Sequence, residues 1–504
     1  MLTRKPGDLF TGFVGGTPVW YSGSGGGIVV AGARGGKLRD WLGYNVCTGI
    51  CSDTLIILDP KNEAAEISKL QVLDQKYCLY WPRFSFNPVS YICIDSPTLV
   101  SDVKVLCDNI VVLSGGGNAQ FFEKRGRQYL ESLILIIVEI DGVLTLPRLY
   151  HAINALLAGG EDLEDLLEAM KTSQFDVCYS TAKEIASSQN GNESSGYRGI
   201  IGELAKAFAP LSDPVLLKSV SPPFDFSIEE LIQSGKNFNF YMTPPAAFLG
   251  AWSAIIKIIM VSLHLIRSRN LGAPRQTWLL DEAFQLKSFP LLLDLYSIAA
   301  GEGCRVISFW QSSFQMRALG PDAENIITAS AELRCYFSIR DLPSANTLSQ
   351  MLGTSTLEFD DVLQQSQAEH ARKHALESLM AGESLINAGL KYDHYQRAAR
   401  IKSKQQRLLR TPSEILHTPR DRMYVFMDAL PAPLYAQRAP YYEQYWMAGR
   451  FHPNPFYKPN DRVRISTLNG HEWRRVIEVP VPPAFADYPQ YADGMYSYIE
   501  GFKP

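Results

Sequence analysis

The sequence predicts an α/β protein whose mainly parallel central sheet is interrupted along the chain by an all-α domain. Continuous apolar runs typical of buried strands recur with helical patterns between them, as in a sheet that is covered on both faces. The interval 106–215 instead carries apolar residues at helical spacing and few strand signals. A chain of 504 residues is long enough for two or three domains, one of them large.

The predicted strands lie on both sides of the all-α interval. In chain order they are IVVAG (28–32), LIILD (55–59), NFNFYM (237–242), TWLLDE (277–282), CRVISFWQ (304–311), CYFSIRD (335–341) and MYVFMD (423–428). Near the C-terminus, RVRISTLNGHEWRRVIEV (462–479) predicts a hairpin, because Asn469-Gly470 suits a type I′ turn.

Composition indicates a soluble protein in a reducing compartment. The eight cysteines are typical of buried, reduced thiols in a cytosolic protein, and the N-terminus lacks the apolar core of a signal peptide. Two apolar stretches, 130–144 and 246–266, approach the length of a membrane span. Both carry internal charges, with Lys257 in the middle of the second, so we expect two buried helices.

The formal net charge of −4 gives the chain no overall attraction to nucleic acid. A contact with DNA would need a local patch or a ring of subunits. The best local patch is 397–410, the end of a predicted charged helical segment over 370–410. The alternative is a solvated helix or linker. The basic residues of the patch are Arg397, Arg400, Lys402, Lys404, Arg407 and Arg410.

A glycine-rich loop follows the first predicted strand. Aligned to the phosphate-binding pattern G-x-x-x-x-G-K-[ST], residues 31–38 keep the central pair Gly36-Lys37. Such a loop surrounds phosphate oxygens with backbone N–H groups, and its lysine neutralises them. The first glycine is replaced by Ala31 and the hydroxyl by Leu38, so the loop alone does not exclude a purely structural turn.

Two further strands end in residues that suit nucleotide hydrolysis. Asp281-Glu282 follows an apolar strand, where the first carboxylate would lie near Mg²⁺ and the second would polarise water. Gln311 ends the next strand, where it would sense a γ-phosphate or orient the water. Because α/β sheets bind ligands at the carboxyl ends of their strands, these pieces predict a RecA-like P-loop NTPase.

Several motifs in the same order resemble those of the type IV coupling proteins, the TraG/TraD-like ATPases of conjugation and type IV secretion. The likeness covers most of residues 10–445. The motifs are VVAGARGGK (29–37), LDPKNEA (58–64), FSFNPVSYI (84–92), LLDEAFQL (279–286), FWQSSFQM (309–316), SANTLSQMLGTST (344–356) and QRLLRTPSEIL (406–416). In this family Ala31 and Arg34 are ordinary, and the hydroxyl of the loop is often absent.

The resemblance implies a RecA-like motor with an all-α domain that binds ATP and Mg²⁺. Such proteins work as homo-hexamers at the bacterial inner membrane. They recruit a relaxase–DNA complex or protein effectors and deliver them to the membrane components of a type IV secretion channel. Most members begin with transmembrane helices that this sequence lacks, so it is either a naturally span-less member tethered by a partner or a shortened form of a longer protein. We expect a cytoplasmic protein that associates peripherally with this membrane.

The resemblance also assigns roles to individual residues. Lys37 would contact phosphate, Asp281 the metal and Glu282 the attacking water, and Gln311 would couple the γ-phosphate to subunit movement. The nucleotide-binding loop would comprise Gly32, Ala33, Arg34, Gly35, Gly36, Lys37 and Leu38. Arg305 and Arg340 are candidates for a charge that acts across a subunit interface.

The predicted domains follow from these assignments. Residues 1–105 form the first part of a nucleotide-binding domain, 106–215 the all-α domain, 216–450 the second part, and 451–504 a tail with the hairpin. The leading hypothesis is an ATP-driven coupling protein. The alternative is a coupling-like scaffold or receptor that hydrolyses ATP weakly or not at all, which the degenerate loop favours because Leu38 supplies no Mg²⁺ ligand.

Overall fold

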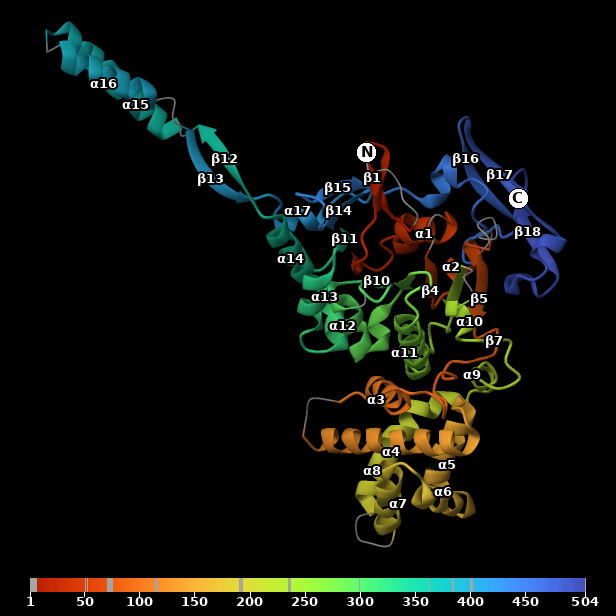
Figure 1. Cartoon of the computed structure of the whole chain (residues 1–504). Helices are drawn as coiled ribbons and strands as arrows, with labels where there is room; N and C mark the ends of the chain where they lie inside the picture. The colour runs from red at the N-terminus through yellow and green to blue at the C-terminus, as the bar shows by residue number, and fades with distance from the viewer. Residues whose placement is uncertain are drawn as a thin grey trace. The chain divides into compact units, whose positions relative to one another are not determined.

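A computed structural model defines the fold of residues 7–503, apart from 50, 52, 70–75, 114–116, 190–193, 234–236, 299, 361, 383–384 and 399–401. The chain forms two compact units, which are 1–338 together with 419–504, and 339–418. The first unit holds the central sheet, the helices around it and a small C-terminal sheet, and the second is built on a helical hairpin (Figure 1).

An 11-stranded sheet lies at the centre of the first unit, in the order β2-β1-β15-β14-β11-β3-β10-β9-β4-β8-β5. From β11 to β5 the strands run parallel, whereas β14, β15, β1 and β2 extend one side of the sheet antiparallel. The strands are β1 (Leu9–Val14), β2 (Thr17–Tyr21), β3 (Gly27–Ala31), β4 (Thr54–Leu58), β5 (Tyr77–Trp81), β8 (Phe238–Met242), β9 (Gln276–Leu280), β10 (Cys304–Trp310), β11 (Leu333–Phe337), β14 (Arg422–Met427) and β15 (Leu434–Gln437). The predicted mainly parallel α/β sheet is confirmed.

Both faces of the parallel strands are buried, which explains their continuous apolar sequences. Every residue of β3, β4, β8, β9 and β10 is buried. Alternate residues of these strands join one apolar cluster with π-helix η1 (Leu38–Leu42) and helix α1 (Gly43–Cys47), where Trp41 meets Phe309 edge to face at 5.3 Å. Each large side chain that is fully buried contributes roughly 1.5–3 kcal/mol. This packing fixes the start of α1 against the sheet.

Helices α11 (Ser253–Arg269), α12 (Pro290–Ser297) and α13 (Ala323–Ser330) belong to the same core. Helix α11 contains the predicted apolar stretch with Lys257, and most of its residues are buried, as expected. The Lys257 ammonium donates a hydrogen bond to the Ser288 carbonyl oxygen at 2.8 Å, and burial lowers its pKa to about 8. The helix therefore accommodates its internal charge through a polar contact within the protein.

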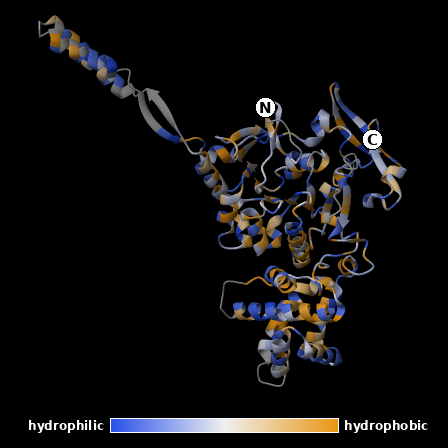
Figure 2. Cartoon of the chain, in the orientation of Figure 1, coloured by the Kyte–Doolittle hydropathy of each residue, from blue (hydrophilic) through white to orange (hydrophobic). Residues whose placement is uncertain are grey.

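An all-helical region lies between β5 and β8 along the chain. Helix α3 (Leu99–Ile110) packs on α11, and α4 (Gly117–Asp141) packs on α3. The apolar residues of α4 between Tyr129 and Val138 are buried among the helices that follow, and Figure 2 shows its hydrophobic residues. These helices are α5 (Leu146–Ala158), α6 (Glu161–Thr172), α7 (Asp176–Gln189) and α8 (Ser194–Phe208). Among the described residues, no helix has both the length and the apolarity that crossing a membrane requires.

Shorter elements connect these layers. They are α2 (Glu63–Ile67), β6 (Phe86–Asn87), η3 (Ala209–Ser212), α9 (Pro214–Lys218), β7 (Phe226–Ser227), α10 (Glu230–Gln233), η4 (Ala283–Leu286), η5 (Ser313–Leu319), η6 (Tyr441–Glu443) and η7 (Tyr445–Met447). Strands β6 and β7 pair in parallel next to the all-helical region. The division of the chain into four domains, at 106, 216 and 451, stays a prediction.

The second unit departs from one sequence-based prediction. Its elements are α14 (Leu342–Leu352), β12 (Thr354–Asp360), α15 (Val362–Met380), α16 (Leu385–Ala398), β13 (Lys402–Leu408) and α17 (Pro412–Leu416). The helical segment predicted over 370–410 is therefore wrong over Lys402–Leu408, where β13 pairs antiparallel with β12. The reason is long-range: β12 is rich in β-branched and aromatic residues, and a strand partner overrides the weak local preference of a polar segment.

The predicted C-terminal hairpin forms between β16 (Arg462–Thr467) and β17 (Gly470–Pro480), and β18 (Met495–Ile499) extends it. Its turn is displaced by one residue from the prediction. Because Thr467 pairs with Gly470, the two loop residues are Leu468 and Asn469. The short helices η8 (Pro483–Phe485) and η9 (Pro489–Tyr491) connect β17 to β18.

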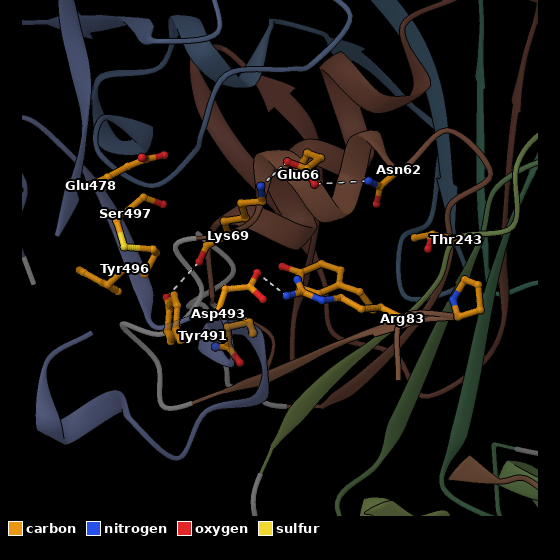
Figure 3. Close-up of a pocket in the computed structure, with 14 residues that line it drawn as sticks. Asn62, Glu66, Lys69, Arg83, Thr243, Glu478, Tyr491, Asp493, Tyr496 and Ser497 are labelled. Carbon is orange, nitrogen blue, oxygen red and sulfur yellow. Dashed lines mark hydrogen bonds and ion pairs between the residues drawn. The ribbon is translucent and has the colours of Figure 1, made fainter. Parts of the chain in front are cut away.

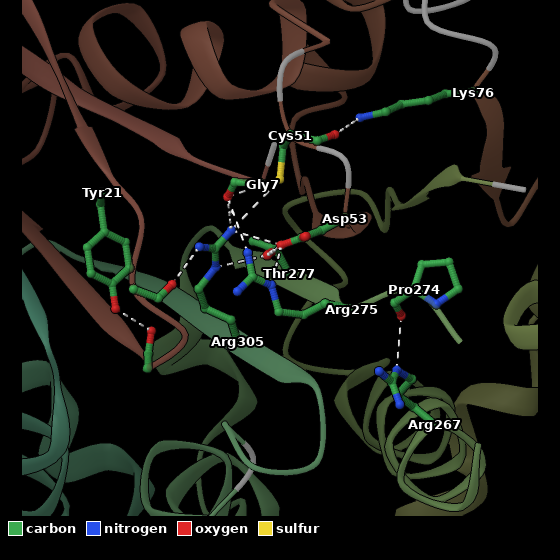
Figure 4. A network of polar contacts seen from close by, with 12 residues as sticks. Gly7, Tyr21, Cys51, Asp53, Lys76, Arg267, Pro274, Arg275, Thr277 and Arg305 are labelled. Carbon is green, nitrogen blue, oxygen red and sulfur yellow. Dashed lines mark hydrogen bonds and ion pairs between the residues drawn. The ribbon is translucent and has the colours of Figure 1, made fainter. Parts of the chain in front are cut away.

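A buried network of polar contacts ties the amino ends of the parallel strands together (Figure 4). The Arg305 side chain is 0% exposed, and its Nη2 lies 2.9 Å from Oδ2 of Asp53. The same carboxylate oxygen is 2.9 Å from Nε of Arg275, whose side chain is 27% exposed. Arg305 also donates to Oγ1 of Thr277 at 3.0 Å and to the Gly7 carbonyl oxygen at 2.8 Å. Asp53 is thus the anion that balances a fully buried guanidinium.

We predict that Asp53→Ala destabilises the protein by roughly 3–5 kcal/mol, because it leaves the buried Arg305 cation without an anion. The matched control is Arg275→Met, which removes a partly exposed partner of Asp53 and leaves the Arg305–Asp53 pair in place. It should lower the free energy of unfolding by about 1 kcal/mol or less. Urea-induced unfolding measures both. Equal losses for the two variants would contradict this account of the network.

Candidate nucleotide-binding site

The carboxyl ends of the parallel strands meet at one edge of the sheet. Trp310 at the end of β10 pairs with Val30 near the end of β3. Leu280 at the end of β9 pairs with Leu58 at the end of β4. The segments that leave these strands carry the glycine loop, Asp281-Glu282, Gln311 and Asp59. Parallel pairing therefore brings together sequence positions that are hundreds of residues apart.

The chain turns tightly after β3. The Gly35 N–H donates to the Gly32 carbonyl oxygen at 2.8 Å, and Gly36 has a φ of +92°. A Cβ atom added at Gly36 would lie 2.8 Å from Oδ2 of Asp40. Helical structure follows at once in η1 and α1, so backbone N–H groups that lack helical partners face the loop. This strand–glycine loop–helix arrangement is the one that binds phosphate groups in nucleotide-binding proteins.

Lys37 connects the loop to the acidic pair after β9. Its Nζ lies 3.2 Å from Oδ1 of Asp281 and 3.1 Å from Oε1 of Glu282. The side-chain amide of Gln311 donates to both carboxylate oxygens of Glu282, at 3.2 and 3.1 Å. A second hydrogen bond, from the Gln311 N–H to Oε1 of Gln315 at 2.8 Å, fixes the backbone at this point. Four side chains predicted for the site are thus in one connected cluster.

The charges of the cluster perturb one another. Burial by itself would lower the pKa of Lys37, but Asp281 and Glu282 together outweigh burial, and the pKa is raised above the ordinary lysine value. Asp59, at the end of β4, is buried. Burial raises its pKa to about 7, with a further contribution from Asp281, although it accepts N–H groups of Ala65 and Glu63. Negative charge therefore accumulates at this edge, with Lys37 as the nearby cation.

Asp281 is suited to hold a divalent cation. Its Oδ1 atom is buried and lies 3.2 Å from the Lys37 ammonium. Carboxylate oxygens are the ligands that Mg²⁺ prefers, usually one or two from the protein together with water and phosphate oxygens. No three His, Cys, Asp or Glu side chains gather as a metal cage in the described part of the chain.

The backbone around the cluster is strained. Arg34, Glu282 and Ser338 have φ values of +57°, +55° and +50°, in the left-handed region that residues with a side chain rarely adopt. Such conformations cost about 1–3 kcal/mol each and gather at functional sites. Here the three residues lie in the phosphate-binding loop, in the acidic pair and at the end of β11, which hydrogen-bonds to Gly32. The strain supports this edge as the functional one.

The structure places the remaining predicted residues as follows. Ala33 and Arg34 form the exposed tip of the loop, and Leu38 is partly buried at the start of η1. Arg305 lies near the amino end of β10, fully buried and paired with Asp53, and is therefore not brought together with the glycine loop and the acidic pair at the carboxyl ends of the strands. Arg340 is exposed and belongs to the unit 339–418.

Other residues of the site were not predicted. Asp59 lies within the motif LDPKNEA, so its position after a buried strand could have identified it. Asp40 and Arg438 form a buried ion pair at 2.9 Å, with both side chains 1% exposed. Asp40 adjoins the loop in sequence, but Arg438 follows β15 hundreds of residues later and has no motif around it. Only the fold brings it to the loop.

A separate cavity of about 410 Å³ lies where β5 and β8 end, against the C-terminal sheet (Figure 3). Its cationic side chains already have anionic partners: Arg83 pairs with Asp493, and Lys69 pairs with Glu66. A phosphate group would have to compete with these carboxylates. The loop that carries Lys37 is the better phosphate site.

Comparison with known proteins agrees with this geometry. The family described as "Type IV secretory system Conjugative DNA transfer" matches residues 3–387. No curated protein matches the chain. Among solved structures, the conjugative coupling protein TrwBΔN70 in its unbound monoclinic form is similar, with a TM-score of 0.58 and 17% identity over 87% of this chain and 92% of that one.

Two ligand complexes of the same coupling protein are also similar. TrwB with ADP and Mg²⁺ gives a TM-score of 0.55 at 16% identity, and TrwB with the ATP analogue ADPNP gives 0.56 at 17%. Each comparison covers 87% of this chain and 92% of the other. At these identities the likeness concerns the fold. It confirms the predicted fold class, a RecA-like core with a mainly parallel sheet and additional helices.

We predict that Gly36→Ala destabilises the protein by roughly 1–3 kcal/mol more than Gly16→Ala, because its Cβ would meet the buried Asp40 carboxylate. Gly16 is the matched control: its φ is +78°, yet nothing lies within 4 Å of an added Cβ. The control variant thus reports backbone strain alone. Unfolding in urea measures both, and equal destabilisation would contradict the close contact at Gly36.

Proposed function

Because the chain belongs to the family of type IV secretory system conjugative DNA-transfer proteins, we propose that it is an ATP-driven coupling protein. It would recruit DNA or DNA–protein substrates and move them to a secretion or conjugation channel. The observation that carries the proposal is the contact of Lys37 with Asp281 and Glu282, at 3.2 and 3.1 Å, directly beside a phosphate-binding loop. A glycine turn with a purely structural role would not require an ammonium group in contact with two carboxylates.

Each residue of the cluster has a chemical task in this proposal. The N–H groups of the loop and the Lys37 ammonium would hold the phosphates of ATP, and Asp281 would hold Mg²⁺. The bound metal would neutralise charge that develops on the phosphates during transfer. Glu282 would orient the attacking water and accept its proton. Gln311 keeps the Glu282 carboxylate in place through its two hydrogen bonds.

The similar solved structures support nucleotide and magnesium as ligands. Their titles describe TrwB with ADP and Mg²⁺, with ADPNP and with the GTP analogue GDPNP. We extend these ligand classes to this chain because its fold is similar and its own residues supply the phosphate-binding loop, the cation and the carboxylates. The likeness alone does not choose between the bases of ATP and GTP.

A scaffold or receptor with little hydrolysis is the second candidate. The observation that favours it is Leu38, which occupies the position of the Mg²⁺-binding hydroxyl and has no oxygen in its side chain. The metal would then rest on Asp281, phosphate oxygens and water. Binding could survive this loss, whereas turnover would be slow. Measured turnover therefore separates the two candidates.

Assembly and partners follow from the family as proposals. We expect a homo-hexamer that associates peripherally with the inner membrane, contacts the membrane components of the secretion system there, and recruits a relaxase–DNA complex or protein effectors. Arg340 remains the candidate for a charge that acts on the neighbouring subunit, since it is exposed.

The proposed DNA contact through 397–410 is weakened by the local ion pairs. Arg397 lies 2.7 Å from Asp393, and Arg407 lies 2.8 Å from Glu414. Arg400 lies outside the described residues. Exposed pairs of this kind are weak, so a polyanion can still displace the carboxylates. The contact stays a proposal.

We predict that Lys37→Ala weakens the binding of ATP by about 10–100-fold, because a charge-assisted contact with phosphate is worth roughly 1.5–3 kcal/mol. Titration calorimetry with a non-hydrolysable ATP analogue and Mg²⁺ measures the effect. The control is Lys206→Ala, since the Lys206 side chain is 79% exposed and distant in sequence from the site motifs. Unchanged affinity in the Lys37 variant would remove the loop from the proposal.

We predict that Glu282→Gln retains nucleotide binding but lowers turnover by at least ~10²-fold, because the amide cannot accept the proton of water. Phosphate release under saturating ATP and DNA measures turnover, with Glu203→Gln as a control on the all-helical region. If the wild-type protein binds ATP but shows no turnover with or without DNA, the scaffold replaces the motor.

A further inference from the structure

Arg438 is a buried guanidinium that contacts the glycine loop and the residues packed behind it. It follows β15, and its side chain is 1% exposed. Its Nη1 donates to the Gly35 carbonyl oxygen at 2.7 Å and lies 2.9 Å from Oδ2 of Asp40. Its Nη2 donates to Oγ of Ser338 at 3.3 Å and to the carbonyl oxygen of Arg420. One planar group therefore joins the loop to three other parts of the first unit.

Asp40 makes such a cation necessary. Its carboxylate is buried beneath the loop, so close that an added Cβ at Gly36 would lie 2.8 Å from Oδ2. A negative charge at this position opposes the binding of phosphate on the other side of the loop, because charges within a few Å in a protein interact strongly. Arg39 also pairs with Asp40, at 2.6 Å, but its side chain is 46% exposed and is screened by water. Arg438 is the buried counter-charge.

We propose that Arg438 is a positioning residue of the nucleotide site, which neutralises Asp40 beneath the phosphate-binding loop and holds Gly35 in place. The inference rests on the proposed function, since it presumes that the loop binds a nucleoside triphosphate or diphosphate. Arg438 touches the loop from behind through Gly35 and Asp40, and it acts on the nucleotide only through them.

The remaining contacts of Arg438 place it where the chain leaves and re-enters the first unit. Ser338 is the last residue before the unit 339–418, and Arg420 follows closely after it. Ser338 has a φ of +50° and accepts the Gly32 N–H at 3.2 Å, so the strained end of β11 also supports the loop. Lysine cannot replace Arg438 fully, because a single ammonium lacks the fork that reaches Gly35, Asp40, Ser338 and Arg420 together.

The experiment compares Arg438→Met, Asp40→Asn and the double variant in the full chain, by calorimetric titration with ADP and Mg²⁺. Arg438→Met should weaken binding at least about tenfold, because it leaves the Asp40 anion beneath the phosphates. Asp40→Asn alone should bind more tightly than the wild type, because the Arg438 cation beneath the phosphates is then unopposed. The double variant should recover affinity to within about threefold of the wild type, because neither charge remains.

Recovery of ADP affinity in the double variant would show that Arg438 acts through its charge and not through packing alone. If Arg438 only fills space, Asp40→Asn cannot restore binding, so a double variant as weak as Arg438→Met would overturn the proposal. Unchanged affinity in Arg438→Met would do the same. If Arg438→Met fails to fold, the neutral but hydrogen-bonding Arg438→Gln takes its place, with binding weakened at least about tenfold expected and wild-type binding contradicting the proposal. Failure of the proposed function is seen separately, as absence of ADP binding in the wild-type protein.

Discussion

Parallel pairing of strands that are buried on both faces is the constraint on which the candidate site depends. β3, β10, β9 and β4 are neighbours in the sheet although they are distant in sequence, and their registers align their carboxyl ends. Each connecting segment then emerges at the same edge: Asp281 and Gln311 directly follow β9 and β10, whereas Lys37 lies six positions beyond β3. The apolar core that fixes the strands, including Trp41 against Phe309, thereby also fixes the distances between Lys37, Asp281 and Gln311.

The charged side chains at the carboxyl ends of the parallel strands determine which ligands this edge of the sheet can hold. Asp59, Asp281 and Glu282 bring carboxylates together, and burial raises the pKa of Asp59 to about 7, with help from Asp281. A divalent cation would relieve this repulsion, and a triphosphate would then satisfy both the metal and Lys37. Under the proposed function, metal and phosphate would support each other at this site, because each would supply the charge that the other needs.

The strands of the parallel core and the residues at their ends could be predicted because both have local signatures. A fully buried strand is continuously apolar, and Gly36-Lys37, Asp281-Glu282 and Gln311 each follow such a run. The antiparallel strands β1, β2 and β15, and the parallel edge strand β5, were not predicted, since their shorter or mixed sequences depend on neighbours for their structure. β13 was predicted as helix for the same reason. The role of Arg438 could not be predicted from the sequence at all, because its partners lie far away along the chain. Gly35, for example, is 403 positions earlier.

Two buried arginine–aspartate pairs lie at opposite ends of the sheet, and their positions give them different consequences. Arg305–Asp53 joins the amino ends of β10, β9 and β4, far from the phosphate-binding loop along the same strands, so its charges serve the fold. Arg438–Asp40 lies directly under the loop, where either charge alone would act on a bound phosphate. Burial makes both pairs costly to break. If Arg438 acts as we propose, only the second pair affects ligand affinity, because the direction of the strands places their amino ends at one edge of the sheet and the glycine loop with Lys37 at the other.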